Sequence, residues 1–175
     1  MASEQLQKIK TPLTPLAGPY GHPFHPIAVT LPIGSWTASI VFDVLSQRAR
    51  EPRIYGRGSA DLVKLGIVGA VGAALLGFVD YVKIPKRSKA GVTASTHMAL
   101  NLAIVALYSI NLVQREKRLA DDRMRDAPVT GGELGLSALA LALLGASGFL
   151  GGVLAYTFGV RVADEVTQAE GLAPV

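Results

Sequence analysis

The sequence has 175 residues, of which half are hydrophobic and only 17% are charged, and its formal net charge is +4. Soluble domains usually carry about 25% charged residues, and the absence of cysteine excludes disulfides, iron–sulfur ligation and thiol catalysis within this chain. Nearly all Lys and Arg lie between apolar segments, where water and lipid headgroups solvate them, so the positive charge does not indicate nucleic-acid binding.

The first segment, residues 1–21, is predicted to be an extended N-terminal arm. Pro12, Pro15, Pro19 and Pro23 lie in or just after it, and each lacks an N–H and disfavours helix in the preceding residue. Pro26 follows at a position where the first turn of a helix tolerates proline. The first membrane helix is therefore expected to begin near this point.

Four apolar segments follow, each near or above the ~20 residues that cross ~30 Å of hydrocarbon. Pro32 lies inside the first segment and is expected to kink it. The sequence therefore predicts an all-α protein, an integral membrane four-helix bundle with antiparallel up-down-up-down order over residues 22–162, and a polar C-terminal tail over 163–175. The predicted spans are Ile27–Leu45, Leu65–Ile84, Ala94–Val113 and Leu134–Val160.

The connections between the spans carry most of the charge. The third connection, Gln114–Gly132, mixes both signs at i,i+4 spacing, so its first half is expected to extend the third helix into solvent. Ten cations lie in the first and third connections and seven on the other side, which predicts a multi-pass protein of the cell membrane with both termini non-cytoplasmic. The ten are Arg48, Arg50, Arg53, Arg57, Lys64, Arg115, Lys117, Arg118, Arg123 and Arg125; the seven are Lys8, Lys10, Lys83, Lys86, Arg87, Lys89 and Arg161.

Small residues are frequent in the second and fourth spans, and Gly148 and Gly152 form a small-xxx-small pair. Such residues let helix backbones approach closely in lipid, so packing is the first interpretation. The second is that they leave room for a flat cofactor against a helix face. Asp43, near the opposite end of the first span, is expected to pair with a loop arginine or with Lys64.

Four ionisable side chains are predicted to gather at one end of the bundle, namely His22, His25, Asp80 and His97. With a rise of 1.5 Å per residue, Asp80 and His97 lie only about 5 Å inside their helix ends. Asn101 occupies the same helix face as His97, one turn deeper. Tyr81 and Tyr156 are expected at similar depth. Ionisable groups in the apolar zone are costly unless they are paired, so the cluster needs an explanation.

Three interpretations remain open for this cluster. In the first it is a structural network, in which Asp80 accepts a hydrogen bond from His97 or Tyr81, His25 closes the start of the first helix, and Asn101 joins two helices. In the second, His22, His25 and His97 bind a cofactor or metal, either haem b or a divalent ion, with Asp80 as ligand or orienting partner. In the third, Asp80 and His97 form a proton or ion path.

Four motifs carry a resemblance to a known family: GHPFHPIAVTLPIGSWTASIVFD, GFVDY, THMALN and GFLGGVLAYTFGVRV. Over about Gly21 to Val162 the chain resembles a bacterial four-helix membrane family of unknown function. Relatives often carry a Rieske-type iron–sulfur domain after the fourth helix, which implies a link to membrane electron transfer. This chain has no cysteine to ligate such a cluster.

The resemblance also bears on the site. His22, His25, His97 and Asp80 match the family's motif positions. Many relatives place a histidine in the LGG-x-L motif, where this chain has Val153, so a site that needs an axial ligand from the fourth span is impaired here.

We therefore expect a small redox-associated accessory subunit with a His-lined haem or metal site near the outer end of the bundle. The alternative is a purely structural or partner-binding membrane subunit with no cofactor. The expected partners are the lipid bilayer and either a membrane redox complex or a second copy of the chain. No nucleophile elbow, phosphate-binding loop or zinc-protease motif is present, so no stand-alone catalytic activity is expected.

Overall fold

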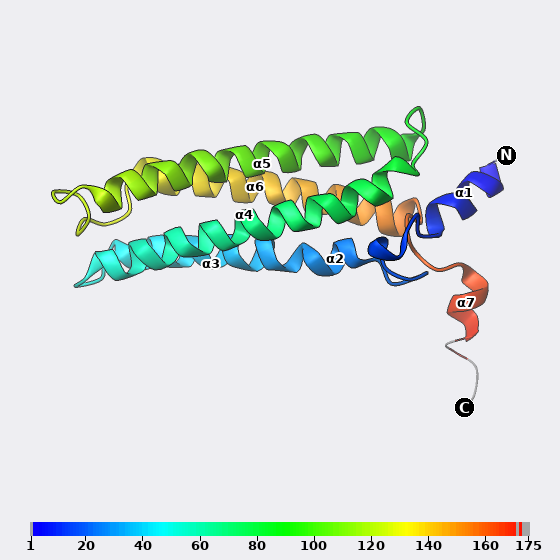
Figure 1. The fold of residues 1–175 in the computed structure, drawn as a ribbon, viewed down its shortest axis with the longest axis horizontal. Coiled ribbons are helices and arrows are strands. Elements are labelled where there is room, and N and C mark those ends of the chain that lie inside the picture. Colours follow the sequence, from blue (N-terminus) through cyan, green and yellow to red (C-terminus); the bar gives the residue numbers. More distant parts are fainter. Residues whose placement is uncertain (1, 171, 173–175) are drawn as a thin grey trace.

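A computed structural model describes residues 2–170 and 172 of the chain, and its elements are helical throughout this part (Figure 1). Four long helices lie side by side, and the short helices nearest the two termini lie at the same end of the bundle. The elements are α1 (Ala2–Lys10), η1 (Pro15–Ala17), α2 (Phe24–Ala28), α3 (Thr30–Ser46), α4 (Pro52–Val82), α5 (Lys89–Ala120), α6 (Gly131–Gly152), η2 (Val153–Thr157) and α7 (Glu165–Glu170).

Four of these segments are long and apolar enough to cross a membrane: Phe24–Ser46, Pro52–Val82, Lys89–Ala120 and Gly131–Thr157. The predicted all-α, four-span class is therefore confirmed. Successive spans run in alternating directions along the bundle (Figure 1). The third helix continues to Ala120, so the charged stretch after Gln114 does extend it beyond the apolar window.

The first span is divided at Val29, between α2 and α3. Pro32 explains the division, because it has no N–H to donate to the carbonyl of Ala28 four residues earlier. The chain continues helically through neighbouring bonds, from Val29 N to His25 O at 3.0 Å and from Ile33 N to Val29 O at 3.2 Å. The expected kink is thus a local break that sets α2, with His25, apart from the rest of the span.

The N-terminal arm differs in part from the extended chain that the sequence predicts. Its first nine described residues form α1, which ends before Pro12, the first proline. The proline-containing part, residues 11–23, is irregular except for the single turn η1. The physical reason is that residues 2–10 contain no proline. Ile9 then packs with Ile84 and Ala94 at the end of the bundle.

The packing of the four spans divides them into two hairpins. α3 packs most closely along α4, and α5 packs most closely along α6. Large apolar side chains such as Val68, Leu102 and Phe149 point outward, as expected for helices whose outer faces meet lipid. The interior between the hairpins holds aliphatic residues such as Val63 and Ile104 together with aromatic and polar side chains.

Three pairs of side chains meet across the centre of the bundle, each pair joining the first span to α5. The imidazoles of His25 and His97 lie with centroids 6.3 Å apart. Trp36 stacks on Tyr108 with centroids 4.3 Å apart. At the far end, Asp43 and Arg115 form a fully buried ion pair. The members of every pair are 72 positions apart in the chain.

The last turn of the fourth span is a π-helix, η2. Such wide turns often occur where a helix meets a functional site, and η2 follows Gly151, which lies against His97. The chain then turns at Gly159 and at Arg161, which has a positive φ of 62° although it carries a side chain. Helix α6 therefore ends in an unusual backbone directly beside the histidine end of the bundle.

Candidate histidine site

His25 and His97 lie together at one end of the bundle. The other predicted site residues do not join this pair. His25 comes from the short helix α2, and His97 lies two turns into α5. Both side chains are half-buried, and their ring planes are nearly perpendicular at 89°. Of the predicted cluster, these two imidazoles lie next to each other, in an edge-to-face arrangement.

Each imidazole is oriented by a backbone carbonyl of the helix that packs against it. Nδ1 of His25 lies 2.8 Å from the carbonyl oxygen of Ala73, and Nδ1 of His97 lies 2.8 Å from that of Ser147. The Ser147 hydroxyl is also 2.9 Å from Nδ1 of His97. A carbonyl accepts only, so both rings carry their proton on Nδ1 and leave Nε2 as an acceptor.

The two Nε2 atoms have different surroundings. Among the described residues, Nε2 of His25 has no hydrogen-bond partner. Nε2 of His97 accepts from the side-chain amide of Asn101 at 3.1 Å, and the same amide donates to the backbone carbonyl of His97 at 2.9 Å. The predicted proximity of Asn101 to His97 is confirmed, although it bonds within its own helix and does not join two helices.

Glycine makes close approach to both rings possible. A side chain at Gly77 would meet the ring of His25 at 2.9 Å, and one at Gly151 would lie 3.4 Å from Cε1 of His97. The helix backbones of α4 and α6 therefore pass directly beside the imidazoles. Other glycines of the same spans, such as Gly72 and Gly148, have open space at this position, so they do not share this role.

Asp80 is not part of the histidine pair. Its carboxylate lies 3.0 Å from the guanidinium Nε of Arg161, and Tyr81 instead bonds to Ser95 through its hydroxyl at 3.0 Å. The expected acceptance by Asp80 from His97 or Tyr81 is therefore wrong. The reason is that Arg161, just after the fourth span, supplies a full positive charge at the end of α4, which a carboxylate prefers to a neutral imidazole.

Arg161 fastens the N-terminal arm to the bundle. Its Nη2 donates to the carbonyl oxygens of Ala17 and Gly18 at 2.9 Å each, and its backbone N–H donates to the carbonyl of Ile9 at 3.1 Å. The residue is only 3% exposed. From the sequence alone Arg161 is one of the cations outside the spans; its burial and its ion pair with Asp80 depend on the folded structure.

Two further predicted residues lie outside the pair. His22 is exposed in the arm, and its backbone N–H donates to the carbonyl of Pro19. Tyr156 is 90% exposed. Within residues 2–170 and 172, no group of three or more His, Cys, Asp or Glu side chains is arranged to hold one metal ion. The four-ligand set predicted from sequence is thus not assembled.

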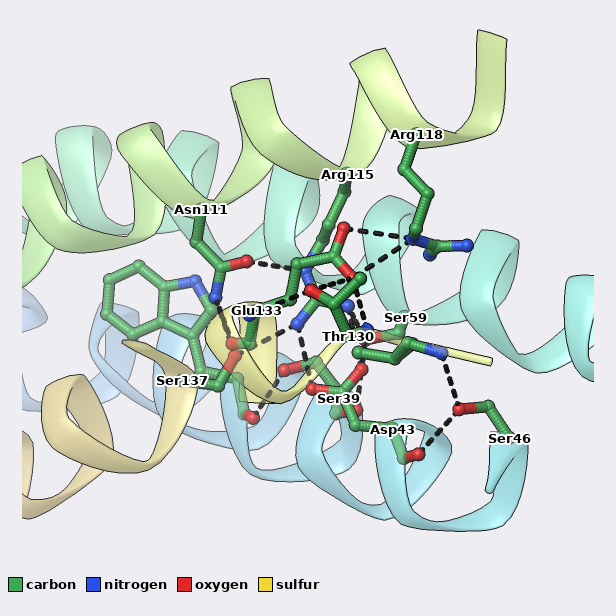
Figure 2. Close-up of polar contacts among 12 residues, drawn as sticks. Ser39, Asp43, Ser46, Ser59, Asn111, Arg115, Arg118, Thr130, Glu133 and Ser137 are labelled. Atoms are coloured by element: carbon green, nitrogen blue, oxygen red, sulfur yellow. Dashed lines mark hydrogen bonds and ion pairs between the residues drawn. The ribbon is translucent and has the colours of Figure 1, made fainter. Parts of the chain in front are cut away.

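A second polar cluster occupies the opposite end of the bundle (Figure 2). The guanidinium of Arg115 binds both carboxylate oxygens of Asp43, at 2.7 and 2.8 Å. The predicted pairing of Asp43 with an arginine of the third connection is therefore correct, although this arginine is fully buried in α5. Ser59, Asn111 and Ser137 complete the donors and acceptors around it.

Next to this pair, Arg118 binds Glu133 through Nε at 3.0 Å. Glu133 also closes a capping box with Thr130 at the start of α6. The cluster therefore contains two acids and two arginines, and its charges balance. Its side chains bind one another, which is what a structural network requires.

Comparison with known protein families adds one finding. Residues 21–164 match the family of predicted membrane proteins named DUF2231. The chain belongs to this family. No curated protein and no solved structure gave a significant match. The DUF2231 match spans all four membrane helices, together with Arg161, the residue that fastens the arm, and the resemblance to a membrane family of unknown function is confirmed.

Proposed function

We propose that this DUF2231 protein is a redox-associated membrane subunit that holds a b-type haem between His25 and His97. The observation that carries the proposal is the pair of carbonyl-oriented imidazoles 6.3 Å apart. Metal-ligating histidines almost always donate their second ring N–H in this way, because the bond fixes the tautomer and the ring orientation.

The spacing of the rings fits one metal centre between them. An imidazole nitrogen binds a first-row metal at about 2.0 Å, and the ring centroid lies roughly 1.2 Å behind the nitrogen, so two rings on opposite sides of one ion have centroids about 6.4 Å apart. Zinc sites take at least three protein ligands, whereas haem iron needs only axial ones. Two histidines without a third ligand therefore favour haem over a divalent ion.

Different residues of the chain would bind the haem, orient its ligands and make room beside them. His25 and His97 would bind, Ala73 and Ser147 would orient the rings, and Gly77 and Gly151 would permit close approach. When bound, haem would supply one-electron chemistry inside the membrane. Nε2 of His97 now accepts from Asn101, so the amide would have to give way; Asn101 remains bonded to the His97 carbonyl.

The second candidate is a structural or partner-binding subunit with no cofactor. The bond from Asn101 to His97 favours it, because it satisfies that imidazole without a metal. The two candidates make opposite predictions for the composition of the purified protein.

The deciding experiment is purification in a mild detergent without chelators, followed by a visible spectrum and metal analysis. We expect a Soret band with about one iron per chain, lost in the His25→Ala/His97→Ala double variant and kept in the His22→Ala control. The His22 control tests the site specifically, because that side chain is exposed in the arm. Protein with neither a Soret band nor stoichiometric metal would establish the structural candidate instead.

The proposal also includes the orientation of the protein in the membrane. Without the buried Arg115, Arg118 and Arg161, eight cations remain on the side of the first and third connections and six on the other side. This excess supports termini on the non-cytoplasmic side, which would put the histidine site near the outer face. A membrane redox complex or a second copy of the chain would be its partner. Reporter tags at Met1 and Val175 that both register the cytoplasm would reverse the orientation and leave the site unchanged.

A further inference from the structure

Three residues in the first hairpin of the bundle correspond in position to three residues in the second. His25, Trp36 and Asp43 in the first hairpin correspond to His97, Tyr108 and Arg115 in the second, always 72 positions later. Each residue meets its own counterpart across the centre of the bundle. Contacts between a residue and its own counterpart, repeated in three layers, are what a two-fold axis between two halves produces.

The contacts inside each hairpin repeat as well. His25 binds the carbonyl of Ala73 on the following helix, and His97 binds that of Ser147, both at 2.8 Å. Trp36 donates to the carbonyl of Val63, and Tyr108 donates to that of Ser137, both at 3.4 Å.

The glycines beside the rings follow the same rule. Gly77 lies four residues after Ala73, and Gly151 lies four residues after Ser147. Carbonyl, glycine and imidazole therefore form the same unit twice. Because successive spans alternate in direction, the first span is parallel to α5, and α4 is parallel to α6. The two-fold axis that relates the hairpins therefore runs along the bundle, and it passes between the two histidines.

A ligand bound between the histidines would lie on the two-fold axis. A group on the axis meets two imidazoles with the same tautomer, the same orienting bond and the same glycine beside the ring. There are two departures. Asn101 has Val29 as its counterpart in the first hairpin, and the Ser147 hydroxyl beside Nδ1 of His97 has no counterpart at Ala73. A site with a single histidine ligand would need one imidazole, one orienting carbonyl and one glycine. The chain has each of these groups in both hairpins.

We propose that the chain is a fused pair of equivalent hairpins and that its histidine site, on the axis between them, binds haem iron from both faces as a six-coordinate centre closed to exogenous ligands. This inference rests on the proposed haem function. It goes further by making the two histidines equivalent and the site closed, which makes it an electron carrier and excludes the binding of dioxygen or carbon monoxide at the iron.

The test uses the full-length protein and three single variants. We expect the native reduced protein to give a low-spin spectrum that carbon monoxide does not change. His25→Gly and His97→Gly should each open one face, so that haem is either high-spin and binds carbon monoxide or is lost. Added imidazole, together with added haem where haem has been lost, should restore the low-spin spectrum in both, with apparent imidazole affinities within about tenfold of each other. His22→Gly should behave as the native protein does.

The outcomes separate this inference from the function on which it rests. Native protein without haem refutes the proposed function. Native protein that contains haem but is high-spin or binds carbon monoxide overturns the closed, two-faced site, while haem binding by the protein stands. The same holds if only one of the two glycine variants alters the spectrum, because equivalent hairpins require both histidines to matter alike.

Discussion

Breaking the Asp43–Arg115 pair should destabilise the bundle more than removing it altogether. Both side chains are completely buried, so Asp43→Leu leaves a guanidinium without its bidentate partner in a low-dielectric interior. Loss of one partner of a buried ion pair costs about 3–5 kcal/mol, and the same range applies to Arg115→Met. If the two changes were independent, the double variant would lose roughly 6–10 kcal/mol.

We expect the free energy of unfolding of the double variant to fall by less than about 3 kcal/mol. Neither charge remains in it, so only the hydrogen bonds of Ser59 and Ser137 to the pair are lost. The assay is reversible unfolding in mixed micelles with an increasing fraction of denaturing detergent. Trp36, the single tryptophan, reports it through its stack on Tyr108. The exposed pair of Glu4 and Lys8 is the control, where Glu4→Ala should change stability by less than about 0.5 kcal/mol. Additive losses would show that the buried charges do not depend on each other.

Two further predictions follow from the same structure. The losses in unfolding free energy caused by Asp80→Ala and Arg161→Ala should be strongly non-additive, since the two side chains form one pair. The losses caused by Asp80→Ala and His97→Ala should add within about 0.5 kcal/mol. Coupling between Asp80 and His97 would contradict the structure. Gly66→Ala should destabilise by about 1–3 kcal/mol because its new methyl overlaps the indole of Trp36, while Gly72→Ala, with open space, should be neutral or stabilising; equal effects in circular dichroism melts would refute the contact.

Much of the architecture could be predicted from the sequence because it depends on local properties. Apolar windows of membrane length mark the spans, and Pro32 marks the break before α3. Alternating span directions bring His25 and His97 to the same end. Asn101 could be placed beside His97 because helix geometry alone sets that spacing.

The partners of the charged residues could not be predicted in the same way. Asp80 and Arg161 come from different spans, and nothing near either residue indicates the other. Arg115 follows the apolar window of its span and was counted with the loop cations, yet α5 carries it into the interior opposite Asp43. The internal equivalence is also hidden in the sequence, because corresponding positions hold different residues, such as Trp36 and Tyr108. Only the offsets reveal it, and these are 72 positions in the first helix of each hairpin and 74 in the second.

The buried pair of Asp43 and Arg115 has a consequence for how such a bundle could arise. If two separate copies of one hairpin assembled, this position would place an acid against an acid or an arginine against an arginine, and both arrangements repel in an apolar interior. Opposite charges can face each other here because the two hairpins differ in sequence at these positions. The ion pair therefore favours the packing of a first hairpin on a second one, and it disfavours any assembly in which two first hairpins or two second hairpins pack together.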